Sequence, residues 1–237
     1  METLQKILEK EQKQICLDIG TGGGNYIHFI HSLYDGYQKY IGIDTMSRAV
    51  EMAQKQAPSD KVEFQVMDAN QMTFEDNTFD LISLSNSLHH LSNPNQTLLE
   101  MHRVLKNDGF ILINEMINED LTNKQKSHML LHHFSAKIDR LNGDIHNDTY
   151  SRNQIEEILL ENNLFEIEVA YDLQVPTKTE NTEEELNYIY NILDRLLQRA
   201  KQEYKKDLQT EANTIKTYIE ENGYDGCTSY VVILRKK

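Results

Sequence analysis

The sequence predicts an α/β fold, in which a mostly parallel sheet is covered by helices on both faces. Short apolar runs, each the length of a strand that is buried on both faces, occur at residues 14–19, 40–44, 62–67, 79–84 and 110–114. Amphipathic stretches, with apolar residues three and four positions apart, separate these runs. Strands that alternate with crossover helices form parallel sheets, which gives the predicted fold class.

The composition indicates a folded, acidic protein. Hydrophobic residues make up 39% of the 237 residues, which predicts a buried core. Basic residues number 24 against 38 acidic ones, and the formal net charge of −14 repels the phosphate backbone of nucleic acids. The sequence contains no signal-type apolar segment near its start and no apolar run long enough to cross a membrane. We therefore expect a cytoplasmic protein without a nucleic-acid partner and without membrane contact.

Helix signals dominate after the fifth apolar run. Thr122 is a suitable N-cap for a helix that we expect to end at Gly143. Ser151 and Gln154 have the spacing of a capping box, which predicts a second helix after residue 151. These signals place two helices directly after the first half of the sheet.

Two more strands and a long helical stretch are expected in the last third of the chain. Residues 165–173 alternate in the manner of a strand, and residues 230–234 are apolar enough for a final one. Between them, residues 182–222 contain an amphipathic pattern that predicts two helices.

A glycine-rich loop follows the first predicted strand and leads directly into a helix. It comprises the segment Asp18-Ile19-Gly20-Thr21-Gly22-Gly23-Gly24. Glycines let the backbone turn sharply and let a ligand lie against the main chain. A dinucleotide fingerprint would require a third glycine where Asn25 stands. An acid two residues before a G-x-G-x-G loop is instead the pattern of methyltransferases.

With this loop, the segment from Gln14 to Glu115 resembles the class I S-adenosylmethionine-dependent methyltransferases, in the subgroup that includes quinone-biosynthesis and other small-molecule enzymes. Phe79-Asp80-Leu81-Ile82, Leu88-His89-His90-Leu91 and Arg103-Val104-Leu105-Lys106 before Gly109 match later regions of this family. The resemblance implies a Rossmann-like, seven-stranded core and the cofactor S-adenosylmethionine. Asn107-Asp108-Gly109 stands where the family usually has a Pro-Gly-Gly turn.

The resemblance also implies which residues bind the cofactor. The loop would hold the methionine part, the acid at the end of the second strand would bind the ribose hydroxyls, and the acid closing the third strand would meet the adenine edge. A carboxylate suits the ribose because it accepts two hydrogen bonds. The predicted cofactor residues are Asp18, Gly20, Thr21, Gly22, Asp44, Thr45, Asp68, Ala69 and Ser85.

The residues after the fourth strand bear on the substrate. They read Ser85-Asn86-Ser87-Leu88, where adenine- and glutamine-methylating enzymes carry an Asn/Asp-Pro-Pro-aromatic motif. Together with the acidic charge, this favours methyl transfer to an O, N, S or C atom of a small molecule. Two alternatives remain open: a protein or RNA-component methyltransferase that binds its substrate through residues 182–222, and a non-catalytic S-adenosylmethionine-binding module.

A histidine-rich segment follows the fifth strand, with four of the nine histidines between residues 128 and 146. On a helix, His128, His132, Ser135 and Asp139 fall within an arc of about 60°. We predict that His128, His132 or His146 contacts the substrate or acts as a base, with Asp139 orienting a ring. The alternatives are a zinc or iron site and a solvated helix face. We assign no metal ligand from the sequence.

These expectations divide the chain into five parts and suggest two kinds of partner. The partners are a small-molecule substrate and a second copy of the chain, bound through the helical insertion. The parts are a cofactor-binding core (1–121), a helical lid (122–150), a continuation of the core (151–181), a helical insertion that caps the site or contacts a dimer partner (182–228), and a last core strand (229–237).

Overall fold

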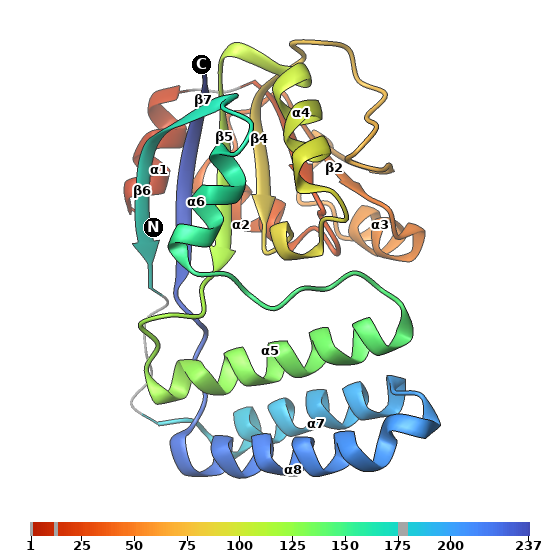
Figure 1. The fold of residues 1–237 in the computed structure, drawn as a ribbon. Coiled ribbons are helices and arrows are strands. Elements are labelled where there is room, and N and C mark those ends of the chain that lie inside the picture. The colour runs from red at the N-terminus through yellow and green to blue at the C-terminus, as the bar shows by residue number, and fades with distance from the viewer. Residues whose placement is uncertain (1, 12–13, 175–179) are drawn as a thin grey trace.

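A seven-stranded sheet forms the centre of the protein in this computed structural model, which describes residues 2–11, 14–174 and 180–237 (Figure 1). The strand order is β3-β2-β1-β4-β5-β7-β6. Among the described strands, β7 alone runs opposite to the others, so the predicted mostly parallel sheet is confirmed. The strands are β1 (Ile15–Ile19), β2 (Lys39–Asp44), β3 (Val62–Val66), β4 (Phe79–Ser85), β5 (Leu105–Met116), β6 (Phe165–Leu173) and β7 (Ser229–Lys236).

Helices cover both faces of this sheet, as the sequence predicts. One face packs against α1 (Glu2–Glu11), α2 (Asn25–Leu33) and α3 (Ser47–Lys55). The other face packs against α4 (Pro94–Val104) and α6 (Arg152–Leu160), and a short 3-10 helix, η1 (Leu88–His90), follows β4. Each face has its own apolar cluster, because side chains of successive strand residues point to opposite sides.

A separate helical layer lies beyond the carboxyl ends of the parallel strands (Figure 1). It consists of α5 (Asn123–Asn142), α7 (Glu183–Arg199), the 3-10 helix η2 (Gln202–Tyr204) and α8 (Lys205–Asn222). Figure 1 shows α5 between the sheet and the pair α7 and α8. The layer has an apolar cluster of its own, to which α5 contributes Leu131, Phe134 and Ile138. The apolar side of the insertion is therefore buried against α5 within the chain.

The predicted helix caps are present. Thr122 and Gln125 form a capping box at the start of α5, and Ser151 and Gln154 form another at the start of α6. Gly143 ends α5 with a φ of 102°, in the left-handed region that glycine adopts without strain. These local hydrogen bonds explain why the helix boundaries were readable from the sequence. Residues 175–179, within the predicted core continuation 151–181, lie outside the described residues.

The fifth strand is longer than expected, because it includes the segment that was predicted to turn before it. Leu105 pairs with Phe79 and Phe110 pairs with Leu81, so four residues of β5 stand against one residue of β4. The residues around Gly109 therefore form an irregularity inside the strand. In the described part of the chain, no helix is both long and apolar enough to cross a membrane.

Candidate active site

The glycine loop follows β1 where the strand order reverses, between β2 and β4, and ligands of open α/β sheets bind at such a point. Gly20, Gly22 and Gly24 have φ values of 65°, 51° and 81°. A Cβ on Gly20 would lie 2.6 Å from the hydroxyl oxygen of Ser87, whereas a Cβ on Gly22 would meet nothing within 4 Å. The loop thus needs glycine for its shape, and it leaves open space beside Gly22.

Asp18 is a buried carboxylate directly before this loop. Its side chain accepts a hydrogen bond of 2.6 Å from the Ser83 hydroxyl, and the residue is 1% exposed. Burial raises the pKa of Asp18 to about 6, and the hydrogen bond from Ser83 opposes this rise. A buried carboxylate beside an open loop is suited to a cationic group such as the ammonium of a bound amino acid.

Asp44, at the end of β2, is held by two backbone amides. One carboxylate oxygen accepts from the N–H of Gly22 at 2.9 Å, and the other accepts from the N–H of Met46 at 2.9 Å. Each oxygen keeps lone-pair capacity for a further donor, as the binding of two ribose hydroxyls requires. Thr45 lies beside it and is exposed. The loop and the acid on the neighbouring strand are therefore fixed to each other.

The other predicted cofactor residues lie at the ends of β3 and β4. Asp68 is exposed, and one of its oxygens accepts from the backbone N–H and the side-chain amide of Asn70. Ala69 is buried beside it. The Ser85 hydroxyl accepts a hydrogen bond of 2.9 Å from the Asn114 side chain. All these positions belong to the same edge of the sheet.

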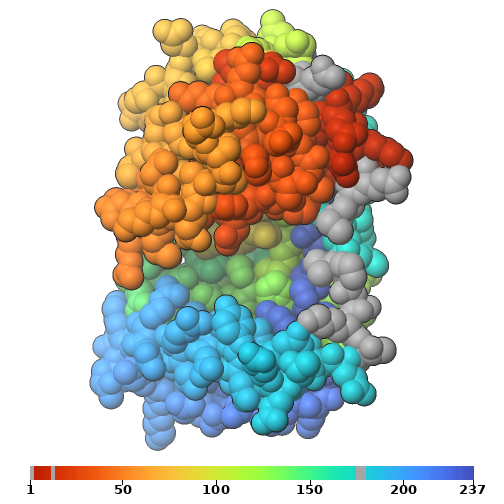
Figure 2. Space-filling view, turned by 180° about the vertical axis from the view of Figure 1, so that it is seen from behind, coloured from red at the N-terminus to blue at the C-terminus, as the bar shows by residue number. Residues whose placement is uncertain are grey.

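A hollow is visible on the back of the molecule (Figure 2). It lies between the red-to-orange surface of the N-terminal strands and helices and the blue surface of α7 and α8. The free space beside Gly22 and the carboxylates of Asp18 and Asp44 fit the amino acid and ribose parts of S-adenosylmethionine.

Three histidines from different parts of the chain meet near this edge. His89 comes from η1, His132 from α5, and His146 from the segment between α5 and α6. One ring nitrogen of each lies within 4.8 Å of the other two. His89 and His146 are buried, whereas His132 retains some exposure. We call these three residues the histidine cluster.

Glu115 fixes the ring of His89. One oxygen of Glu115 accepts from Nδ1 of His89 at 2.9 Å, and the other accepts from the backbone N–H groups of Ser87 and Leu88 at 2.7 and 2.9 Å. Because a carboxylate only accepts, Nδ1 carries a proton in this hydrogen bond, and the neutral form of the ring would carry a lone pair on Nε2. Nε2 of His89 is buried and has no hydrogen-bond partner.

Asp139 fixes the ring of His146 in the same way. One oxygen accepts from Nδ1 of His146 at 2.8 Å, and the other pairs with the guanidinium of Arg199 from α7. Nε2 of His146 then lies 3.2 Å from Nε2 of His132. Burial and the neighbouring histidines lower the pKa of His132 to about 2, so this ring is neutral.

The structure separates His128 from the other predicted histidines. Its Nδ1 accepts a hydrogen bond of 3.0 Å from the backbone N–H of Cys227, and its ring lies against Tyr224. His132 therefore belongs to the histidine cluster and Asp139 contacts it, whereas His128, which was expected on the same face, does neither. The alternative of a solvated helix face is also wrong for Asp139, which is only 9% exposed.

His89 and Glu115 are not among the site residues predicted from the sequence, although both contact the cluster or belong to it. Both residues follow or end neighbouring parallel strands, β4 and β5, whose carboxyl ends meet at one edge of the sheet. That placement was a usable signal, because the two side chains had to lie close together. No signal of this kind connects the two residues to His132 on α5 or to His146 in the segment after α5.

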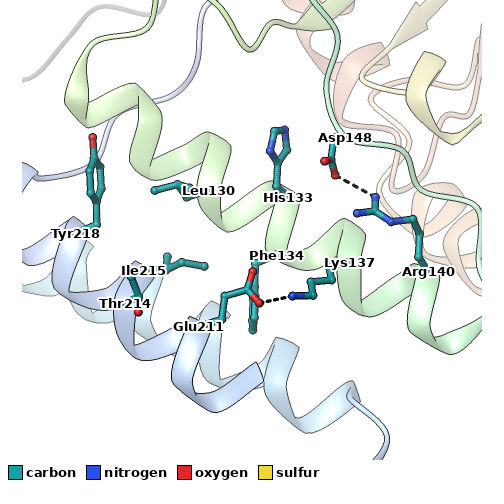
Figure 3. A pocket seen from close by; sticks show the side chains of 10 residues that line it. All are labelled: Leu130, His133, Phe134, Lys137, Arg140, Asp148, Glu211, Thr214, Ile215 and Tyr218. Atoms are coloured by element: carbon teal, nitrogen blue, oxygen red, sulfur yellow. Dashed lines mark hydrogen bonds and ion pairs between the residues drawn. The ribbon is translucent and has the colours of Figure 1, made fainter. Parts of the chain in front are cut away.

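A surface pocket lies elsewhere, between α5 and α8, with a volume of about 340 Å³ (Figure 3). Ion pairs of Lys137 with Glu211 at 2.6 Å and of Arg140 with Asp148 at 3.0 Å lie along it. The residues that line it include no member of the glycine loop or of the histidine cluster. The pocket is therefore separate from the glycine loop and from the histidine cluster.

Comparison with known proteins shows which family the part of the chain with the glycine loop matches. Residues 17–113 match the methyltransferase domain family. The matched segment contains the glycine loop, Asp44, Asp68 and the end of β4. This segment is therefore a methyltransferase domain of the class I, S-adenosylmethionine-dependent kind, and S-adenosylmethionine is the cofactor of that class.

Among curated relatives, the methyltransferase YcgJ of Bacillus subtilis is 34% identical over 119 residues, which cover 48% of this chain and 46% of YcgJ. The ubiquinone/menaquinone biosynthesis C-methyltransferase UbiE of Desulfotalea psychrophila is 33% identical over 93 residues, covering 39% of this chain and 37% of UbiE. A demethylmenaquinone methyltransferase of Bacteroides fragilis is 30% identical over 118 residues, which cover 48% of this chain and 47% of that protein. The matches thus span about half, or less, of these relatives.

Solved structures match over the whole chain at lower identity. The crystal structure of YcgJ from Bacillus subtilis has a TM-score of 0.61 at 21% identity and covers 100% of this chain and 97% of that one. A SAM-dependent methyltransferase of Methanosarcina mazei has a TM-score of 0.58 at 19% identity, with coverages of 97% and 96%. These matches show that the overall fold is shared.

Proposed function

We propose that this chain transfers a methyl group from S-adenosylmethionine to a small-molecule acceptor. The observation that carries the proposal is the histidine cluster beside the glycine loop. The Ser87 hydroxyl donates a 3.0 Å hydrogen bond to the carbonyl oxygen of Gly20, and His89 lies two residues further along the same turn. The cofactor loop and the buried histidines therefore belong to one connected structure at the edge of the sheet.

Some residues at this edge of the sheet would bind the cofactor, and others would contact the acceptor. Asp18 is placed to accept from the ammonium group of the methionine part, and Asp44 from the ribose hydroxyls. When bound, S-adenosylmethionine supplies the methyl group on its sulfonium sulfur. His132 is only part-buried, so its ring can contact an acceptor. Its pKa is lowered to about 2, so we assign it a contact with the acceptor and not the role of a general base.

The names of the relatives support a small and oxygen-bearing acceptor. UbiE and the demethylmenaquinone methyltransferase are named for methylation in quinone biosynthesis, the former at carbon. The alternative of a macromolecular substrate docked on the apolar stripe of residues 182–222 finds no support, because α5 already covers the apolar side of α7 and α8.

The proposal is tested in two steps. The first is calorimetric titration of the purified chain with S-adenosylmethionine and with S-adenosylhomocysteine, for which we expect binding at one site. The second is incubation with S-adenosylmethionine and a series of hydroxylated aromatic acceptors, with S-adenosylhomocysteine formation as the readout. Absence of binding would reject the cofactor site, whereas binding without turnover on any acceptor would favour the non-catalytic module.

A further inference from the structure

We propose that the histidine cluster, His89, His132 and His146, binds a divalent transition-metal ion, for which zinc is the best match. The sequence prediction assigned no metal ligand to this chain, and none of its candidate pairings included His89. The inference instead follows from how the three rings face one another in the folded chain.

The spacing of the ring nitrogens fits a metal ion. Zinc binds histidine nitrogen at about 2.0–2.1 Å, so two ligands at a tetrahedral angle are separated by about 3.3 Å. Nε2 of His132 and Nε2 of His146 are 3.2 Å apart. The ring nitrogen that His89 offers lies within 4.8 Å of both, so binding a metal would require it to approach the other two.

Hydrogen bonds within the cluster do not give every Nε2 atom of the three histidines a partner. The Nδ1 atoms of His89 and His146 are directed at Glu115 and Asp139, so the neutral rings that a metal requires would offer their lone pairs on Nε2. The neutral ring of His132 can donate one N–H, and it lies against His146. Nε2 of His89 is then left buried without a partner. A buried polar atom without a hydrogen bond is costly, and a cation between the three rings satisfies all of them.

The groups around the cluster carry negative charge, and they hydrogen-bond to its histidines as carboxylates do around metal sites. A metal-binding histidine commonly donates its other ring N–H to a carboxylate, which fixes the ring and raises its basicity. Glu115 and Asp139 do this for two of the three rings. One guanidinium, that of Arg199, offsets only part of their negative charge. The local charge therefore favours a cation.

The ligand set indicates which metal and which further ligand. Imidazole nitrogen suits zinc, iron, nickel and copper, and three protein ligands leave a tetrahedral zinc with one open position, as in catalytic zinc sites. His132 is the member of the cluster that is not fully buried, so the open position is reached from its side. If the proposed methyl transfer is correct, an oxygen of the acceptor would occupy this position, but metal binding itself does not depend on that function.

Metal binding is tested on the full chain, after removal of any polyhistidine tag and of bound metal by a chelator. Calorimetric titration with zinc chloride should show one ion per chain. Titration with cobalt chloride should give the visible absorption of a tetrahedral cobalt site. His132→Ala should weaken zinc binding at least roughly tenfold and remove the cobalt absorption, and Asp139→Asn should weaken zinc binding by roughly tenfold to a hundredfold.

His133→Ala is the matched control. His133 is the neighbour of His132 on α5, but its Nε2 bonds to the hydroxyl and backbone N–H of Thr149 and not to the cluster. We expect this variant to bind zinc as tightly as the unmodified chain. Circular dichroism shows whether each variant is folded, and S-adenosylhomocysteine binding, measured separately, distinguishes failure of the metal site from failure of the proposed function. The inference is overturned if the unmodified chain binds no stoichiometric zinc, or if His132→Ala binds it equally well.

Discussion

Two acids at the cofactor edge differ in their surroundings, and this difference gives each a separate expected role. Asp44 is half-buried and held by two backbone amides, so it presents a fixed carboxylate at the end of β2. Asp18 is fully buried, and burial raises its pKa to about 6. We propose that the first acid accepts from the neutral ribose hydroxyls, and that a cationic group of the cofactor stabilises the second.

Replacing Asp44 tests its predicted contact with the ribose. Asp44→Ala should weaken the binding of S-adenosylhomocysteine by roughly 1.5–3 kcal/mol, because two hydroxyls would lose a charged acceptor. Calorimetric titration measures the change, with Asp35→Ala as a control at an acid outside the site. An unchanged dissociation constant for Asp44→Ala would remove Asp44 from the cofactor site.

Asp18→Asn should have opposite effects on stability and on cofactor binding. The folded pKa of about 6 lies above the ordinary value of 3.8, so this carboxyl group lowers the free energy of unfolding as pH rises from about 4 to about 6. At pH 7 the ligand-free variant should be more stable by up to about 3 kcal/mol, and at pH 4 the difference should vanish.

Urea unfolding at the two pH values measures this stability difference, and calorimetric titration measures the accompanying loss of cofactor affinity. A variant that is less stable than the unmodified chain at pH 7 would contradict the assignment of Asp18 as an unfavourably buried carboxylate. A variant that binds the cofactor equally well would contradict its contact with the ammonium group.

At the scale of elements, α5 connects the sheet edge to the insertion. Its apolar side chains pack against α7 and α8, while His132 and Asp139 reach the histidine cluster. Arg199, from the end of α7, pairs with Asp139 and so links the insertion to the ring of His146. The helical layer therefore helps to orient the cluster.

Phe134→Ala tests how strongly this layer is held together. Phe134 is 1% exposed at the contact of α5 with the insertion, so its removal should lower the free energy of unfolding by roughly 3–5 kcal/mol. Urea unfolding gives the value. Leu99→Ala, at a position of α4 that is 47% exposed, is the control and should change stability by less than about 0.5 kcal/mol. Equal, small effects would mean that the layer is not packed as described.

At the scale of the whole molecule, cofactor binding should stabilise the folded chain. S-adenosylhomocysteine at a free concentration of 100 times its dissociation constant should raise the free energy of unfolding by about 2.7 kcal/mol, because it binds the folded state alone. Urea unfolding with and without the ligand measures this increase. Asp44→Ala should show a much smaller increase at the same concentration, and an equal increase would point to a binding site away from Asp44.

The predicted homodimer remains a prediction for the whole molecule. The apolar side of α7 and α8, which the sequence offered as a dimer contact, is occupied by α5 of the same chain. Any dimer would therefore use other surfaces, and sedimentation of the purified chain measures whether one forms.

The sequence by itself determined the strands, the helix caps, the glycine loop and the acids at the ends of β1, β2 and β3. These features are readable because they depend on residues close together in the chain, such as Thr122 with Gln125, or on the rule that parallel strands end at one edge. The family resemblance of residues 14–115 followed from the same local motifs.

Only the tertiary structure decided which histidines meet. His132 and His146 contact each other, His89 joins them from another layer, and His128 turns to Cys227 instead. Helical spacing fixes the angle between side chains on one helix, but it fixes neither the rotation of that helix against its neighbours nor the path of the segment after it. Packing of α5 between the sheet and the insertion sets both, and so it brings residues distant in sequence into one buried cluster.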